Sequence, residues 1–202
     1  MSWTIEENDE NEDGLRKMKA ALDRASKKDI LLFCSAKDIS GAWSGNPGYP
    51  QNSNVPMFCV GGATLNGKRS EKVGDQPVDI LCPEYFPDSR PRGSPDAAGS
   101  AGSDIATALA AGVAGLLLYC ISLTDAHSRT SEAPSPECMD MRRYRVMKAM
   151  LGTMVDSSGY LRPKTFGMED VLPFRKSEED KLKEIIDTIQ GCVRLYPPRS
   201  CV

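Results

Sequence analysis

The sequence predicts an α/β layered fold with a mostly parallel sheet. Three continuous apolar runs of strand length occur along the chain, and segments with helical periodicity lie before and after them. Strands that are apolar throughout are typical of sheets covered on both faces, and their combination with helices favours parallel pairing. The 202 residues are 40% hydrophobic and 26% charged, which excludes a disordered, collagenous or coiled-coil chain.

The first helix is expected at residues 15–27. Apolar side chains recur there at spacings of three and four, so they share one helix face; they are Leu15, Met18, Leu22 and Ala25. The preceding residues 6–13 include six acids, and this run is expected to be a solvated loop. Outside that run, 22 acidic and 25 basic residues remain.

The three apolar runs are each expected to form a buried strand. They occupy residues 30–34, 57–60 and 78–82, and Pro83 is expected to stop the third. Between the second and third runs, the pair Asn66 and Gly67 is typical of a hairpin turn.

An uncharged segment of nineteen residues, 105–123, is expected to form the central helix, with Ser103 or Asp104 as its N-cap. Further helices are expected at residues 139–151 and 178–190. The tail after Arg194, which contains two consecutive prolines, is expected to fray.

Charge and cysteine content narrow the function classes. A net charge of -3 argues against a nucleic-acid partner bound by bulk charge. The seven cysteines are odd in number and contain no C-x-x-C pair, so they favour buried thiols in an intracellular, reducing compartment over a disulfide or zinc site. No metal and no cofactor is therefore expected, and the single histidine, His127, is the one imidazole available for acid–base chemistry.

Two segments suggest a specific function, and each also has an ordinary structural explanation. The helix at 105–123 is long enough to span a bilayer, but its many Ala and Gly residues and the absence of aromatic belts favour a soluble core helix. Residues 62–68 match the G-x-x-x-x-G-K part of a phosphate-binding loop, but Arg69 follows where Ser or Thr is needed to hold magnesium. An Asn-Gly turn explains that glycine more simply.

Four segments in order resemble subtilisin-like serine proteases, most closely the intracellular fungal domains. Residues 102–114 resemble G-T-S-x-A-T-P-x-x-A-G-x-x-A, and residues 1–3 resemble the M-S-x strand end that borders the substrate cleft. Residues 30–38 resemble the strand that leads to A-x-G-N. Residues 60–64 followed by 78–83 resemble V-G-A-T and V-D-I-x-A-P. The resemblance implies a three-layer α/β/α sandwich whose N-terminal portion is missing, with residues 1–192 as a partial domain and 193–202 as a tail.

The same resemblance implies that the catalytic machinery is degenerate. Asp104 stands at the position of the nucleophilic Ser, and Asp38 at the position of the Asn that completes the oxyanion hole. An ionised carboxylate repels the developing oxyanion. The segments that would carry the family's Asp and His are absent, and His127 lies after the nucleophile position. We therefore expect no hydrolysis by this mechanism.

The resemblance leaves at most a binding function for a peptide or protein partner. The substrate-binding residues that it implies border a residual cleft: Ser2, Trp3, Thr4, Ser35 and Ala36. Two alternatives stay open. One is that the chain is a fragment of an active serine endopeptidase whose Asp and His half is encoded elsewhere. The other is a membrane protein anchored by residues 105–123. The oligomeric state is not predicted.

Overall fold

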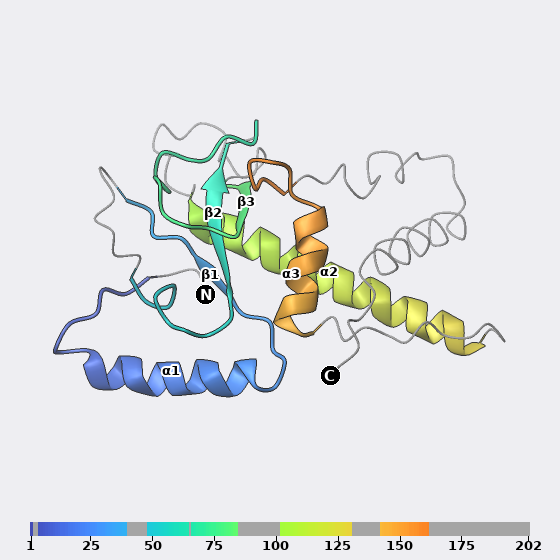
Figure 1. The fold of residues 1–202 in the computed structure, drawn as a ribbon, viewed down its shortest axis with the longest axis horizontal. Coiled ribbons are helices and arrows are strands. Elements are labelled where there is room, and N and C mark those ends of the chain that lie inside the picture. Colours follow the sequence, from blue (N-terminus) through green and yellow to red (C-terminus); the bar gives the residue numbers. More distant parts are fainter. Residues whose placement is uncertain (2–3, 40–47, 65, 85–101, 131–141, 162–202) are drawn as a thin grey trace, which may run out of the picture. The chain divides into compact units, whose positions relative to one another are not determined.

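The computed structural model describes residues 1, 4–39, 48–64, 66–84, 102–130 and 142–161, and for residues 123–130 it describes the backbone alone. One helix precedes and two helices follow a small parallel sheet in this part of the chain, so the α/β prediction is confirmed (Figure 1). The chain divides into two compact units. One comprises Met1–Gly112 with Asp156–Leu161, and the other comprises Val113–Val155 with Arg162–Val202.

The sheet has three parallel strands in the order β1-β2-β3, with bounds Phe33–Ser35, Phe58–Ala63 and Ile80–Pro83. The β1–β2 register places Cys34 opposite Cys59, and the β2–β3 register places Gly61 opposite Leu81. Every residue of β1 and β2 is buried, as expected for strands covered on both faces.

Each expected strand is present, but its limits differ from those predicted. β2 continues through Gly61 and Gly62, which an apolar run does not include. A Cβ atom on Gly61 would lie 3.1 Å from side-chain carbons of Leu81 and Val73, so the neighbours fill the space that a side chain would take. β3 ends at Pro83, as predicted, but Pro83 is itself the last paired residue, one position beyond the predicted limit.

Asn66 and Gly67 do form a tight turn, in which Gly67 has a φ of +77° and Ala63 bridges Arg69 in antiparallel fashion. The turn does not join β2 to β3 as a hairpin, because those strands are parallel. No helix follows it within residues 66–84, so the segment lacks the strand–loop–helix context of a phosphate-binding loop.

α1 spans Glu12–Ser26 and buries Leu15 and Leu22 in the same cluster as Cys34 of β1. The helix begins three residues before the predicted limit, inside the acidic run. Its first turn holds Glu12 and Asp13, whose negative charges are favourable at a helix N-terminus. The last two acids of the run therefore belong to a helix rather than to a loop.

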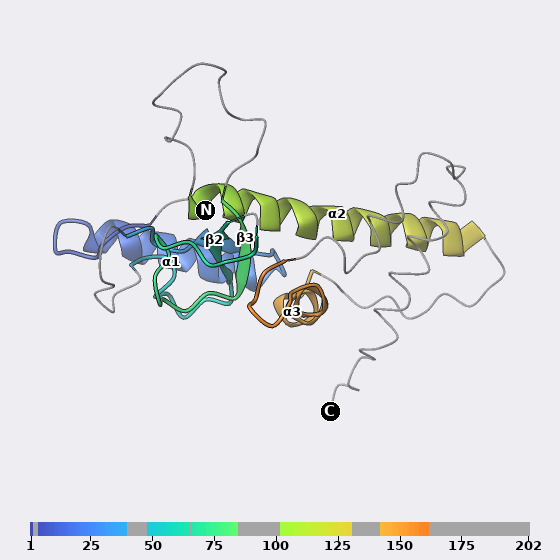
Figure 2. The same cartoon turned by 90° about the horizontal axis from the view of Figure 1, so that it is seen from above.

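α2 spans Ser103–Thr130 and is one continuous helix (Figure 2). It extends beyond the predicted 105–123 at both ends, and His127 lies within it rather than after it. One face is buried, comprising Ser103, Ala106, Thr107, Ala110, Ala114 and Leu117. Residues Ser103–Ser122 have a mean hydropathy of 2.0 and are the one stretch among the described helices that is long and apolar enough to cross a membrane.

α3 spans Tyr144–Thr153, five residues later than the predicted start and two later than the predicted end, and buries Met147, Met150 and Leu151. Residues 139–141, the expected helix at 178–190 and the tail after Arg194 lie outside the described residues.

Candidate functional site

The two positions that the resemblance assigns to catalysis lie together at the carboxyl end of the sheet. Asp38 follows β1, and Asp104 lies in the first turn of α2. A Cβ atom on Gly102 would lie 2.5 Å from Asp38 Oδ2 and 3.0 Å from Asp104 Oδ1, so both carboxylates approach the same glycine. In open α/β sheets this edge is where ligands ordinarily bind.

Asp38 caps the N-terminus of α2. The backbone N–H of Ser103 donates to Asp38 Oδ2 at 2.9 Å, and the Ser103 hydroxyl donates to Asp38 Oδ1 at 2.6 Å. The first N–H groups of a helix have no partner within it, and a carboxylate there also meets the positive end of the helix dipole. The cap is thus supplied by a residue after β1, and not by Ser103 or Asp104 as the sequence predicted.

Ser103 also fastens the helix to the sheet. Its Oγ accepts a hydrogen bond from the backbone N–H of Gly62 in β2 at 3.0 Å, and the side chain has no exposed surface. The hydroxyl therefore donates a hydrogen bond to Asp38 and accepts one from Gly62. The sequence analysis missed this role, because no local pattern pairs Ser103 with residues that lie 41 and 65 positions earlier.

A third carboxylate reaches the same edge from Glu84, which follows β3. Its N–H donates to the carbonyl of Ala63 at 2.9 Å, and its carbonyl accepts from the N–H of Gly102 at 3.1 Å. Glu84 Oε2 is buried, and no described residue hydrogen-bonds to it. It lies 3.0 Å from where a Cβ of Gly62 would be. The side chains of Asp38, Glu84 and Asp104 make this edge electronegative.

The described part of this electronegative edge lacks the donor set that a metal ion would need. Among the residues that the structure describes, no group of three or more His, Cys, Asp or Glu side chains is arranged to hold a metal ion. Asp38 is committed to Ser103, and Asp104 is exposed to solvent.

Within α2, no histidine lies close to Ser103 or Asp104. His127 is the one histidine in the sequence, and it lies in the same helix as Ser103, 24 residues further on. That separation is roughly six helical turns, whereas a general base must lie within hydrogen-bond reach of its nucleophile. The arrangement therefore cannot activate a hydroxyl as the serine protease triad does.

Of the residues of the expected peptide cleft, the structure describes Thr4, Ser35 and Ala36. The carbonyl of Met1 accepts a hydrogen bond from the N–H of Ser35, and the N–H of Ala36 donates to the carbonyl of Val60. Ser35 and Ala36 are both buried, and Thr4 is half-buried. Ser2 and Trp3 lie outside the described residues.

The adjoining Lys37 has both its backbone and its side chain occupied. Gln76 accepts from the Lys37 N–H at 3.1 Å and donates to the Lys37 carbonyl at 2.6 Å. The Lys37 ammonium binds Glu6, and this hydrogen bond holds the pKa of the Glu6 carboxyl below its usual value. A peptide could therefore not pair with the backbone of Lys37 without displacing Gln76.

A comparison with protein-family models and a comparison with curated proteins both give no match for this chain.

Proposed function

We propose that this chain is the C-terminal part of a subtilisin-like α/β/α domain that does not catalyse hydrolysis and serves as a binding module for a peptide or protein partner. Two features of the fold support the proposal. The three parallel strands follow one another in sequence order, and α2 begins at their carboxyl end. These are the places at which the resemblance puts the strands and the helix that carry the active site.

The observation that carries the loss of catalysis is the bidentate contact of Asp38 with Ser103. An oxyanion hole needs hydrogen-bond donors that are free to meet a developing negative charge. Here the Ser103 N–H and hydroxyl both donate to a carboxylate at 2.9 and 2.6 Å. These two donors are already used, and the negative charge that uses them would repel an oxyanion.

Asp104 adds to this effect. Its carboxylate lies in the first turn of α2, on the exposed side of the helix, and approaches the same glycine as Asp38. A carboxylate at the nucleophile position cannot play the part of a serine hydroxyl in acyl transfer. The peptide or protein partner would bind next to this edge at Thr4, which is half-buried; Ser35 and Ala36 are buried, so they would contact a partner only after a local rearrangement.

The experiment is to treat the purified chain with a fluorophosphonate probe, which labels activated serines, and to measure casein hydrolysis in parallel. We expect no labelling and no hydrolysis from the wild-type chain or from Asp104→Ser, because the restored hydroxyl still has no base. An active subtilisin-like protease in the same assay is the positive control. Labelling of the wild-type chain would support the fragment of an active endopeptidase instead, and labelling of Asp104→Ser alone would contradict our account of the missing base.

One observation favours a second candidate, which is membrane anchoring by α2. In the stretch Ser103–Ser122 only 33% of the residues are buried, whereas a soluble core helix is mostly buried. Against it, Ser103 is tied to Gly62 and Asp38, so the start of the helix is committed to the sheet. Extraction of cell membranes with alkaline carbonate tests this candidate. Recovery of the chain in the supernatant contradicts membrane anchoring, and retention in the pellet supports it.

A further inference from the structure

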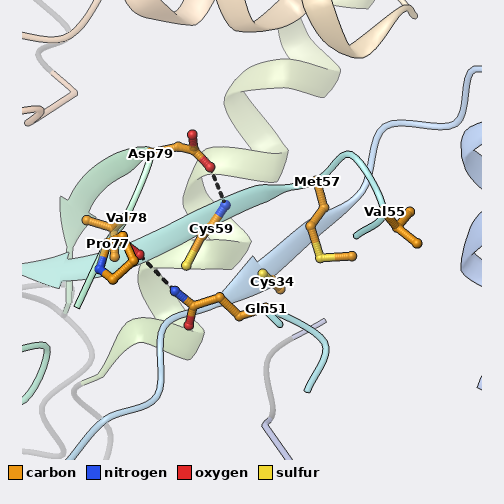
Figure 3. Close-up of a pocket in the computed structure, with 8 residues that line it drawn as sticks. All are labelled: Cys34, Gln51, Val55, Met57, Cys59, Pro77, Val78 and Asp79. Atoms are coloured by element: carbon orange, nitrogen blue, oxygen red, sulfur yellow. Dashed lines mark hydrogen bonds between the residues drawn. The ribbon is translucent and has the colours of Figure 1, made fainter. Parts of the chain in front are cut away.

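A cavity of about 250 Å³ lies on one face of the β1–β2 pair, and three sulfur-bearing side chains line it (Figure 3). They are Cys34 from β1, Cys59 from β2 and Met57, which immediately precedes β2. Asp79, just before β3, also lines it. The cavity lies away from the edge where Asp38 meets Ser103, and neither of those residues contributes to it.

The strand register explains why the sulfur atoms gather on one face. Cys34 and Cys59 are directly paired residues of neighbouring parallel strands, so their side chains leave the sheet on the same side. Met57 lies two positions before Cys59, and side chains two apart along a strand also share a face. The three residues belong to one buried cluster, with exposed fractions of 0% for Cys34, 7% for Cys59 and 8% for Met57.

The two thiols interact directly. A hydrogen bond from Cys59 lowers the pKa of the Cys34 thiol, and the same interaction together with burial raises the pKa of Cys59. Cys34 is therefore the first of the pair to ionise. The positive charge of Arg69 acts in the opposite direction on Cys59 and favours its thiolate. A cation placed between the two sulfur atoms would favour both thiolates together.

We infer that Cys34, Cys59 and Met57 form a binding site for a soft monovalent metal cation, copper(I). Thiolate and thioether sulfur are the ligands that copper(I) prefers, and few ligands suffice for it. Zinc is a poorer fit, because a structural zinc ion takes four nitrogen, sulfur or oxygen ligands in tetrahedral geometry. Among the described residues no third cysteine, histidine or free carboxylate completes such a set at this cavity.

Binding has a simple proton balance. Each thiol releases its proton to solvent as the Cu–S bond forms, and the Met57 thioether binds without losing a proton, so one copper(I) ion replaces two protons. Asp79 keeps its carboxylate at the wall of the cavity, where its Oδ2 accepts a hydrogen bond from the Cys59 N–H at 2.9 Å. Its negative charge opposes ionisation of both thiols, and its attraction for the bound cation offsets only part of this cost, because one copper(I) ion replaces two protons.

The test is an anaerobic competition of the reduced full-length chain with the copper(I) chelator bicinchoninate, followed by its absorbance. Cys138, Cys192 and Cys201, which lie outside the described residues, are replaced by Ser throughout, so that Cys34, Cys59, Cys82 and Cys120 remain. We expect one equivalent of copper(I) to be bound. Cys34→Ser or Cys59→Ser should weaken binding by more than the roughly 10- to 100-fold that loss of an outer-shell partner costs. Met57→Leu, which keeps the volume, should weaken it by a smaller factor.

Cys82→Ser is the matched control, because Cys82 is equally buried in the neighbouring strand β3 but does not line the cavity. It should retain one equivalent at unchanged affinity. Circular dichroism identifies any variant that fails to fold. X-ray absorption at the copper edge gives a second readout without the Cys34, Cys59 or Met57 variants, and we expect sulfur as the only ligand type. Absence of competition, a nitrogen or oxygen shell, or full binding by folded Cys34→Ser or Cys59→Ser overturns the inference.

Discussion

Ser103 shows how much one buried hydroxyl can do in this fold. Its Oγ accepts a hydrogen bond from the backbone N–H of Gly62 in β2, and its hydroxyl donates to the carboxylate of Asp38, which follows β1. The contact with Gly62 satisfies a buried N–H that would otherwise be unpaired away from water, whereas the Asp38 carboxylate lies at the surface. If the Ser103 hydroxyl is removed, a buried partner is still shielded from water but no longer has a hydrogen bond that compensates for the lost hydration.

Ser103→Ala should lower the free energy of unfolding by about 1–3 kcal/mol, because it leaves the buried Gly62 N–H and one Asp38 oxygen without their partner. Urea unfolding followed by circular dichroism measures the change. Ser122→Ala in the same helix is the control. Its hydroxyl bonds the carbonyl of Leu118 at an exposed position, so a change within about 0.5 kcal/mol is expected. Equal effects of the two variants would contradict the role of Ser103.

Cys82 gives the chain a dependence on alkaline pH. Burial raises the pKa of its thiol from 9.0 to about 12. Between these two values the unfolded chain has lost the proton and the folded chain retains it. Stability from this group is therefore complete below pH 9 and falls as the pH rises, by up to about 1.4 kcal/mol per pH unit.

The corresponding measurement compares urea unfolding at pH 8 and pH 10 for the wild-type chain and Cys82→Ala. The variant should lose less stability over this interval. An identical loss in both proteins would show that Cys82 does not contribute.

At the scale of single residues, the resemblance predicted that Asp38 and Asp104 share one site, but the sequence did not predict the contacts that they make there. The resemblance placed Asp38 and Asp104 at one site, and the structure brings both to Gly102. The pairing of Asp38 with Ser103, and that of Cys34 with Cys59, depends on which strands are neighbours and in what register. No local pattern contains that information, because a shift of one residue would send the side chains to opposite faces.

At the scale of elements, the three apolar runs predicted the three strands of the described sheet, and a long segment without charged residues predicted the central helix. The limits differ where other forces act. β2 includes two glycines because side chains of its neighbours fill the adjacent space, and α1 begins early because acids favour a first turn. α2 continues past Leu123 because charged residues such as Asp125 and Arg129 do not by themselves end a helix.

Two glycines of one segment should respond oppositely to alanine. In Gly102→Ala the new Cβ would lie 2.5 Å from Asp38 Oδ2, so the carboxylate must move away from Ser103, and we expect a loss of about 1–2 kcal/mol, as for other helix caps. Gly112 lies within α2 and a Cβ there meets nothing within 4 Å, so Gly112→Ala should stabilise by roughly 0.5–1 kcal/mol. Thermal unfolding of both variants checks the signs, and destabilisation by Gly112→Ala would contradict the open space at that position.

At the scale of the whole molecule, the surroundings of the exposed face of α2 distinguish the binding module from the membrane-anchored candidate. Leu116 and Tyr119 are 48% and 61% exposed, whereas the adjacent Leu117 is 4% exposed. Exposed apolar side chains of this number are ordinary on a soluble protein. In a membrane-anchored protein the same face would contact lipid, where a charge is costly.

Leu116→Lys and Leu117→Lys form a matched pair for this question. If α2 faces water, Leu116→Lys should change the free energy of unfolding by no more than about 0.5 kcal/mol and leave the chain soluble without detergent. Leu117→Lys should destabilise by more than about 3 kcal/mol, because it buries a charge without a partner. Chemical unfolding and the soluble yield of both variants measure these effects. A severe loss from Leu116→Lys would favour a covered or lipid-facing surface.

The cap on α2 has a consequence for the chain during its synthesis. Asp38 and Ser103 are 65 residues apart, so the first strand leaves the ribosome well before the helix that closes its carboxyl end. At about 5–20 residues per second, translation of that interval takes roughly 3–13 s. During this time the edge of the sheet at Gly62 has no helix to cover it, and the apolar strands beside it are open to other chains. We therefore expect chaperone demand for this protein to be greatest in the interval before Ser103 emerges.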